Sequence, residues 1–282
     1  MTMHQSTVLR ELLLSGETLV MPDAYDALSA RIIEKLGFNA VQCSGFSVAL
    51  AAAVAPEPAF GLEPNLAGTE AIVRAVRVPV MADGEDGFGD ASVIPDTVRA
   101  YVGVGVAGIN IEDQVLGQPG PKQVIPLAEA VAKLKAARQA TVEAGVPDLI
   151  LNGRTDALMA GDTPEAGLAE AISRANAYLA AGADLAFVIG VDDIEQVNVL
   201  VREINGPVSI AAGMPNNLGS LSIARLRDAG VARVSLPSLL LFSAIRAMMR
   251  SLESVRQSDG FDEIVAHDMV CEMGDVAALM AP

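Results

Sequence analysis

The sequence predicts a (β/α)8 barrel, a closed ring of eight parallel strands in which helices alternate with the strands. Short, uninterrupted apolar segments typical of buried parallel strands alternate with helical segments along the 282 residues. One sequence pattern recurs along the chain: a helix ends at a glycine, and an apolar strand follows at once. The alternative is an open doubly wound sheet, but no glycine-rich phosphate-binding motif follows the first strand.

The eight predicted strands form two groups. The repeated pattern, which ends in a strand, occupies residues 34–41, 101–111, 178–188 and 226–235. The other strands are predicted at residues 19–21, 77–82, 147–152 and 206–211. Because these units fill the chain, residues 1–282 are interpreted as a single barrel domain.

The intervening helices carry their own start signals. Residues 26–36 place apolar side chains at helical spacing, and residues 126–144 begin at a proline and carry alternating Lys, Arg and Glu. Thr163, Pro164 and Glu165 provide a cap, a first residue and an acidic first turn for another helix. The chain is therefore expected to enter its helices at defined residues.

Three segments lie outside this alternation. Residues 53–65 and 115–123 are rich in Pro and Gly and are predicted to be loops that close over the barrel mouth. Residues 259–282 are predicted to form a C-terminal helical extension. Its apolar stripe at helical spacing consists of Val265, Met269, Val270 and Met273. Such a stripe predicts packing on a neighbouring subunit, and hence a homo-oligomer, either a dimer or a tetramer.

Composition argues against several classes of function. The net charge of -16 disfavours binding to nucleic acid or to an anionic membrane surface. No apolar run reaches the roughly 20 residues that span a bilayer, and the first residues show no signal-peptide pattern. Cys43 and Cys271 are the only cysteines, so we expect no disulfide framework and a cytoplasmic location. His4 and His267 lie far from every predicted strand end, which disfavours histidine chemistry.

Carboxylates gather where two neighbouring strands end. Residues 80–90 run from an apolar strand into a glycine-rich turn that contains Asp83 and Glu85, and Glu112 follows the next strand. Like charges at close range cost stability unless a cation is present, and hard divalent cations prefer oxygen ligands. A solvated acidic turn is the alternative for either segment alone. Because the carboxyl ends of barrel strands share one face, the pair predicts a metal site at the mouth.

Arg154 follows the fifth strand at the same face. It is predicted to anchor a substrate carboxylate, although an ion pair with Asp156 or Glu112 is the alternative. A metal opposite one arginine suits a small dicarboxylate or 2-oxo acid, whose carboxylate and keto oxygens can chelate the cation. The cation would stabilise an enolate when a neighbouring bond breaks.

Two other strand ends offer candidates with alternatives. Tyr25, after the first strand, is either part of the wall or a proton donor. The Ser44-Gly45 turn, after the second, is either only a turn or a pair of amides that bind a carboxylate. Cys43 is interpreted as a small core residue because no basic residue adjoins it.

Taken in order, these motifs resemble the isocitrate lyase and phosphoenolpyruvate mutase superfamily. The resemblance covers residues 13–249 and rests on residues 22–30, 82–90, 111–114 and 152–156. It implies a barrel, a bound Mg²⁺ with Mn²⁺ as an alternative, and 2-oxo acid chemistry through an enolate. It also implies that the C-terminal helix is exchanged between subunits.

The resemblance assigns roles to individual residues. It implies that the metal is surrounded by Asp83, Glu85 and Glu112. It implies that Arg154 binds the substrate and that the carboxylate-binding turn is Ser44, Gly45 and Phe46. From the resemblance and the strand ends together, the catalytic candidates are Arg154, Glu112 and Tyr25.

The chain departs from the superfamily pattern in three places. Residues 115–123 lack the Lys-Lys/Arg-Cys-Gly-His motif of the lyases, and Ile189 stands where a Glu is usual. Residues 61–65 lack the Asp of the phosphonate enzymes. These departures disfavour isocitrate or methylisocitrate cleavage by the usual route, and also phosphoryl transfer.

The favoured function is therefore an Mg²⁺-dependent carbon–carbon lyase or decarboxylase that acts on a small 2-oxo or 2-hydroxy dicarboxylate through an enolate. The first alternative is a phosphonopyruvate-type phosphomutase or hydrolase that uses Glu63 or Asn65. The second is a barrel that binds a 2-oxo acid without turning it over.

Overall fold

The computed structural model describes residues 4–55, 59–117 and 120–280, and it contains a closed barrel of parallel strands in sequence order. The strands are β1 (Leu19–Ala24), β2 (Val41–Cys43), β3 (Val80–Asp83), β4 (Gly108–Glu112), β5 (Ile150–Thr155), β6 (Leu185–Val188), β7 (Val208–Ala211) and β8 (Arg233–Leu236). Strand β1 pairs with both β2 and β8, which closes the ring. The predicted fold class is confirmed.

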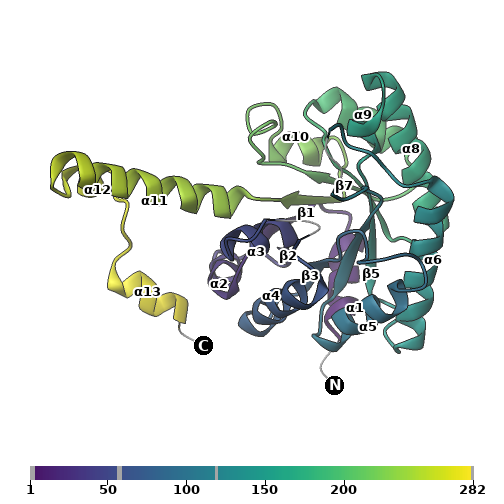
Figure 1. The fold of residues 1–282 in the computed structure, drawn as a ribbon, viewed down its shortest axis with the longest axis horizontal. Helices are drawn as coiled ribbons and strands as arrows, with labels where there is room; N and C mark the ends of the chain where they lie inside the picture. The colour runs from purple at the N-terminus through teal and green to yellow at the C-terminus, as the bar shows by residue number, and fades with distance from the viewer. Residues whose placement is uncertain (1–3, 56–58, 118–119, 281–282) are drawn as a thin grey trace.

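Helices surround the barrel and continue beyond it at the C-terminus (Figure 1). In the first half they are α1 (Gln5–Leu14), α2 (Ala27–Lys35), α3 (Gly45–Ala51), α4 (Leu62–Ala75), α5 (Ile94–Gly103) and α6 (Leu127–Glu143). In the second half they are α7 (Ala157–Ala160), α8 (Pro164–Ala180), α9 (Ile194–Glu203), α10 (Ile223–Asp228), α11 (Leu239–Ser258), α12 (Asp262–Ala266) and α13 (Met273–Met280).

Side-chain caps start several of these helices. The Asp26 carboxylate accepts a hydrogen bond from the Ser29 amide at the start of α2, and the Thr163 hydroxyl accepts one from the Ala166 amide at the start of α8. The capping role predicted for Thr163 is confirmed. The rings of Tyr101 and Tyr178 pack with apolar side chains of β4 and β5 between the barrel and its helices. Burial of these side chains is the main force that holds the helices against the strands.

Strand register brings the acidic strand ends together. Residue Asp83 of β3 lies opposite Asn110 of β4, and Glu112 of β4 lies opposite Arg154 of β5. Neighbouring strands are about 4.8 Å apart, so side chains that point to the same face at these positions are within reach of one another. Residue Arg154 lies within β5, not beyond it, because β5 continues to Thr155.

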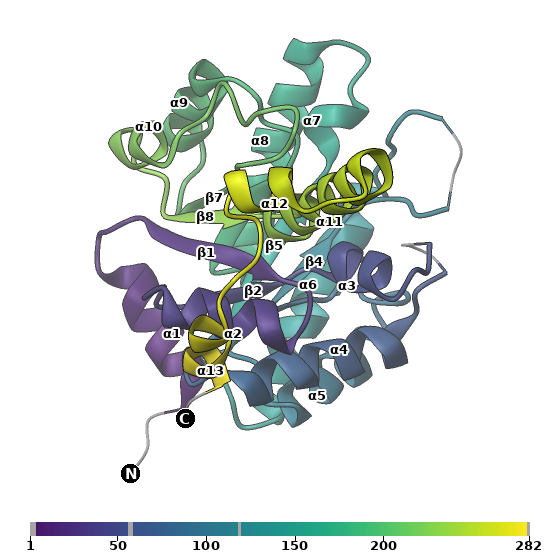
Figure 2. The same ribbon diagram turned by 90° about the vertical axis from the view of Figure 1, so that its left-hand side faces the viewer.

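The C-terminal helices form an arm. Helix α11 projects from the barrel after β8, α12 lies near its far end, and the chain returns so that α13 lies beside α2 (Figures 1 and 2). The Arg31 guanidinium donates a hydrogen bond to the Leu279 carbonyl in this contact. The helical extension predicted for residues 259–282 consists of two short helices in the described part of the chain, because Asp268 adopts φ of 48° and the chain leaves α12 there.

The two predicted mouth loops fall partly on residues 56–58 and 118–119, which lie outside the described residues. Helix α4 begins at Leu62, so the first of these loops is shorter than predicted. Across the described ranges, no helix combines the length and the apolar character needed to cross a membrane.

Candidate active site

Three buried carboxylates meet where β3 and β4 end. Asp83, Glu85 and Glu112 each offer an oxygen, and these oxygens lie within 4.8 Å of one another. All three predicted metal ligands are therefore brought together in one cluster. Carboxylates packed this closely repel one another, so the cluster needs a compensating positive charge.

The backbone of the β3–α5 turn aims Glu85 back toward the cluster. Gly84 passes so close to β4 that a Cβ there would lie 2.5 Å from the Asn110 carbonyl oxygen. Glu85 itself adopts φ of 48°, which is uncommon for a residue with a side chain, and its carbonyl accepts the Glu112 amide at 2.9 Å. Strained backbone of this kind concentrates at functional sites.

Each carboxylate is held by a neighbouring group. The Gly45 amide donates to Asp83 Oδ2 at 3.1 Å, and Asn65 Nδ2 donates to Glu85 Oε1 at 3.2 Å. The other oxygen of Asp83, Oδ1, is buried and has no hydrogen-bond partner within the described ranges. Burial raises the pKa of Asp83, although Arg154 opposes this effect. A buried oxygen in a trio of hard donors fits a divalent cation.

Arg154 bridges two acids. Its Nη1 lies 2.6 Å from Glu112 Oε2, and its Nε and Nη2 donate to both carboxylate oxygens of Asp156 at 3.0 and 3.1 Å. Burial lowers the pKa of Arg154, but Asp156 and Glu112 outweigh burial and raise that pKa well above its usual value. These contacts use three of the five guanidinium N–H groups, so donors remain for a substrate carboxylate.

Asp113, next to Glu112, points away from this cluster. Its carboxylate accepts hydrogen bonds from Thr155, Arg174 and Tyr178, with the Tyr178 hydroxyl at 2.5 Å. Successive side chains of a strand face opposite sides, so only one of two adjacent acids can reach the mouth. Asp113 instead joins β4 to α8.

The predicted carboxylate-binding turn lies at the start of α3. Ser44 caps that helix by accepting the Ser47 amide, and Ser44 and Phe46 line the mouth. The Gly45 amide is engaged by Asp83. Cys43 is fully buried in an apolar cluster, which confirms its interpretation as a core residue.

Tyr25 follows β1 and is half-buried. Burial, assisted by Asp26, raises the pKa of Tyr25. Asp23 of β1 lines the mouth cavity, whereas Tyr25 is not among the described residues that line it. The structure thus places Asp23, and not Tyr25, on the cavity that Asp83 also lines.

The barrel mouth holds a cavity of about 400 Å³. Its polar lining includes Asp83, Asn110, Arg154 and Asp156, and its apolar lining includes Phe187, Ile189, Met214 and Phe242. A cavity of this size accommodates a small organic acid. The chemistry described above is therefore accessible to a ligand.

A family model described as Phosphoenolpyruvate phosphomutase matches residues 9–256 of the chain. The chain belongs to the phosphoenolpyruvate mutase/isocitrate lyase superfamily. It is similar to 2,3-dimethylmalate lyase of Eubacterium barkeri, with 32% identity over 264 residues that cover 91% of this chain and 88% of the relative. Oxaloacetate decarboxylase of a Bradyrhizobium species is 32% identical over 246 residues, covering 84% of this chain and 82% of the relative.

Other similar proteins carry different activities in their names. Carboxyvinyl-carboxyphosphonate phosphorylmutase of Arabidopsis thaliana is 33% identical over 249 residues, covering 85% of this chain and 71% of the relative. The crystal structure of 2,3-dimethylmalate lyase superposes with a TM-score of 0.82 at 27% identity, covering 92% of this chain and 90% of that one. Oxaloacetate acetylhydrolase bound to the inhibitor 3,3-difluorooxalacetate gives a TM-score of 0.82 at 25% identity, with 98% and 95% covered.

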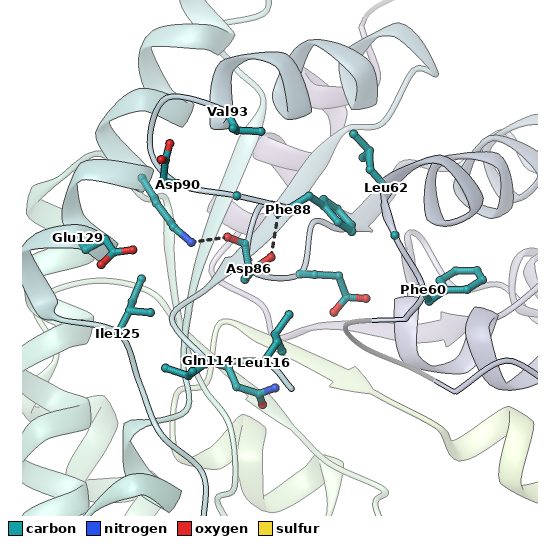
Figure 3. A pocket seen from close by; sticks show the side chains of 15 residues that line it. Phe60, Leu62, Asp86, Phe88, Asp90, Val93, Gln114, Leu116, Ile125 and Glu129 are labelled. Carbon is teal, nitrogen blue, oxygen red and sulfur yellow. Dashed lines mark hydrogen bonds between the residues drawn. The ribbon is translucent and has the colours of Figure 1, made fainter. Parts of the chain in front are cut away.

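Within this superfamily barrel, a second cavity of about 730 Å³ adjoins the first (Figure 3). The two share Gln114, and Glu85 of the carboxylate cluster lines the second. Lys133 of α6 donates to the Asp86 carbonyl at 2.8 Å and so ties the acidic turn to that helix. This cavity is bordered by the described parts of both predicted mouth loops.

Sequence reasoning missed two buried titratable groups beneath the mouth, Asp23 and Arg233, which shift each other's pKa. Burial raises the pKa of Asp23 to about 8, and Arg233 partly opposes this rise. Burial lowers the pKa of Arg233 to about 10 while Asp23 and Asp83 act against it. Arg233 donates to Ser209 at 2.8 Å and lies 5.6 Å from the ring centre of Phe187. The signal in the sequence was a single arginine, Arg233, within the short apolar segment at residues 231–235.

Proposed function

We propose that this protein is an Mg²⁺-dependent lyase or decarboxylase that cleaves a carbon–carbon bond in a small 2-oxo or 2-hydroxy dicarboxylate. The observation that carries the proposal is the buried trio Asp83, Glu85 and Glu112, next to Arg154 and close to one cavity. The named activities of the relatives include lyase and decarboxylase reactions, so the proposal lies within the range of the superfamily.

Asp83, Glu85 and Glu112 would hold the cation, directly or through water, since Mg²⁺ usually keeps several waters and only one or two direct carboxylates. When bound, the cation would supply positive charge where the enolate oxygen develops. Arg154 would bind a substrate carboxylate with its remaining N–H groups while Glu112 and Asp156 fix its plane. Ser44 and Phe46 would border the other carboxylate.

Proton delivery is assigned by position. Asp23 lines the cavity, and burial raises the pKa of its carboxyl to about 8, which favours the protonated form near neutral pH. Its Oδ1 accepts the Leu236 amide at 2.8 Å, which leaves Oδ2 to donate the proton. Tyr25, whose hydroxyl is protonated at neutral pH, is the second candidate. In a decarboxylation, CO₂ would leave and Asp23 would give its proton to the enolate, with Tyr25 as the alternative donor although it does not line the cavity. In the cleavage of a 2-hydroxy acid, the Asp23 carboxylate would then take up the proton that the hydroxyl releases, so the protons balance.

The phosphonate alternative has weaker support. Glu63 is exposed on α4, and the Asn65 side chain is buried between Glu85 and Tyr101. Neither lines the mouth cavity among the described residues. A non-catalytic barrel would share the same ligand contacts and differ only in turnover.

Two measurements test the proposal. Calorimetry should show that Asp83→Ala lowers Mg²⁺ affinity at least about tenfold, because the variant loses a carboxylate of the cluster. A tenfold loss corresponds to about 1.4 kcal/mol of binding free energy. Product analysis with a panel of 2-oxo and 2-hydroxy dicarboxylates should show a shorter 2-oxo acid or CO₂ without phosphate. Unchanged Mg²⁺ affinity would contradict the metal assignment. Phosphate release from a phosphonate would favour the mutase or hydrolase, and binding without turnover would favour the non-catalytic barrel.

A further inference from the structure

The mouth cavity has two chemically different sides. Polar and charged groups line it at the ends of β1, β3, β4 and β5. The wall formed by β6, the residues after β6 and β7, β8 and the start of α11 is mostly apolar, with polar side chains only at Asn216, Ser235 and Ser238 among the described residues. The apolar side consists mainly of Phe187, Ile189, Met214 and Phe242. A ligand held by the carboxylate cluster and Arg154 would therefore turn its opposite end toward hydrocarbon.

The apolar side is a packed surface. Phe187 and Ile189 are 4% and 8% exposed and pack with Ala211 and Met214 in one cluster. At the rim, the rings of Phe46 and Phe242 meet edge to face with centres 6.5 Å apart. Well-packed side chains of this kind cannot open to admit water around a charged group without loss of packing.

Positive charge is confined to the polar side. Within the described ranges, the cations that line this cavity are Arg154 and Lys122. Arg154 contacts Glu112 and Asp156, and Lys122 lies 3.9 Å from Asp156 and donates to Gln114. Arg233 lies 5.6 Å from the Phe187 ring centre but does not line the cavity, and it already donates to Ser209 and Gln42. A further carboxylate placed against Ile189 would therefore lose its water without contacting a cation, which is unfavourable.

We propose that the substrate is a 2-oxo or 2-hydroxy dicarboxylate with an alkyl substituent, and that Phe187, Ile189, Met214 and Phe242 select that substituent and exclude a third carboxylate. The inference rests on the proposed function because the dicarboxylate end must bind at the cluster. It also separates the relatives: 2,3-dimethylmalate lyase is named for an alkylated acid, and oxaloacetate decarboxylase for one without alkyl groups. The lining of this mouth favours the alkylated class.

The test compares dissociation constants of malate, 3-methylmalate, 3-ethylmalate and isocitrate with saturating Mg²⁺, each measured by competition against oxalate. Each carbon that becomes buried should tighten binding roughly fourfold, so 3-ethylmalate should bind on the order of tenfold more tightly than malate. Isocitrate, with its third carboxylate, should bind more weakly than malate. For any acid that is turned over, kcat/KM is compared in place of the dissociation constant.

Variants locate the preference. Ile189→Ala should reduce the ratio of malate to 3-ethylmalate dissociation constants at least threefold, and Phe242→Ala, at the exposed rim, tests the same wall if the first variant folds poorly. Val142→Ala truncates an exposed side chain on α6, away from the mouth, and should leave the ratio unchanged.

The outcomes are distinguishable. Binding of oxalate and malate without any alkyl preference, or isocitrate binding as tightly as 3-ethylmalate, would overturn this inference and leave the proposed function standing. Failure of oxalate and all malates to bind in the presence of Mg²⁺ would overturn the proposed function, and this inference with it.

Discussion

Arg154 connects the two acidic parts of the mouth at the scale of single residues. It pairs through Nη1 with Glu112 of the carboxylate cluster and through a two-point contact with Asp156 at the end of β5. Both ion pairs weighed as alternatives from the sequence are therefore present, while N–H groups remain for a substrate. Arg154 could therefore support the fold through its ion pairs or bind the substrate carboxylate, and substitution of Arg154 should have different effects in the two cases.

Arg154→Lys should lower kcat/KM by two to three orders of magnitude. A lysine cannot reproduce the planar two-point contact, and loss of one charged contact to the developing transition state costs about 2–4 kcal/mol. The melting temperature should also fall, because Lys cannot satisfy both Glu112 and Asp156. Thermal melting and steady-state kinetics on the acid that proves active check both effects.

Arg174→Lys is the matched control for this variant. Arg174 is a buried arginine that pairs with Asp113 at 3.1 Å and Glu170 at 2.7 Å, outside the mouth cavity. It should lower the melting temperature and leave turnover near normal. Normal turnover in Arg154→Lys, with reduced stability alone, would show that Arg154 only supports the fold.

Single residues also show what a sequence can reveal about a site. Asp83, Glu85, Glu112 and Arg154 could be located because polar residues at or just beyond the carboxyl ends of apolar strands reach the mouth of a parallel barrel. Adjacent residues such as Asp113 face the other side of the strand. Without the exact register of the strand, the sequence does not tell which of two adjacent acids faces the mouth. Arg233 could not be assigned because its partners are set by strand register and barrel closure: Ser209 lies opposite it on β7, and Gln42 comes from β2.

At the scale of elements, the first residue of α3 sits against the carboxylate cluster. The Gly45 amide donates to Asp83, and a Cβ on Gly45 would lie 1.8 Å from Glu85 Oε1 and 2.6 Å from Asn65 Nδ2. Real Cβ atoms do not approach other atoms so closely, so this helix reaches the cluster only because the residue is glycine.

Gly45→Ala should weaken Mg²⁺ binding at least about tenfold, because the new methyl group would displace Glu85 or push α3 away from Asp83. Calorimetric titration of Mg²⁺ measures the effect. Gly103→Ala, at the end of α5 with open space around the new Cβ, should bind Mg²⁺ like the parent protein. Equal affinity in the two variants would remove α3 from the metal site.

Element order was predictable, and element ends less so. Apolar runs and helix-ending glycines identified every strand, because burial on both faces demands such runs. Strand β5 continues through Arg154 because the ladder to β4 and β6 tolerates a polar side chain that faces the mouth. The split between α12 and α13 depends on the φ of Asp268, which hydrophobic spacing does not report.

At the scale of the whole molecule, the arm leaves apolar surface uncovered. Helix α11 exposes Met248, Met249 and Leu252, of which Leu252 is 71% exposed. Beyond it, the predicted stripe residues Val265, Val270 and Met273 are also exposed, at 76%, 67% and 81%. Several large exposed apolar side chains on one projecting segment are typical of a site that another chain covers.

We expect a homo-oligomer in which this arm packs on a neighbouring copy of the chain. Two changes test it by light scattering and sedimentation: truncation after Ser258, which removes α12 and α13, and Leu252→Lys on α11. Each should yield a smaller assembly than the parent dimer or tetramer, because burial of a large apolar side chain contributes about 1.5–3 kcal/mol at each contact. Gln257→Lys adds the same charge at an exposed polar position of α11 and should leave the size unchanged. A truncated chain that stays soluble and keeps the size of the parent assembly would refute the assignment. Such a result would show that the apolar residues beyond Ser258 are not needed for contact with a neighbouring chain.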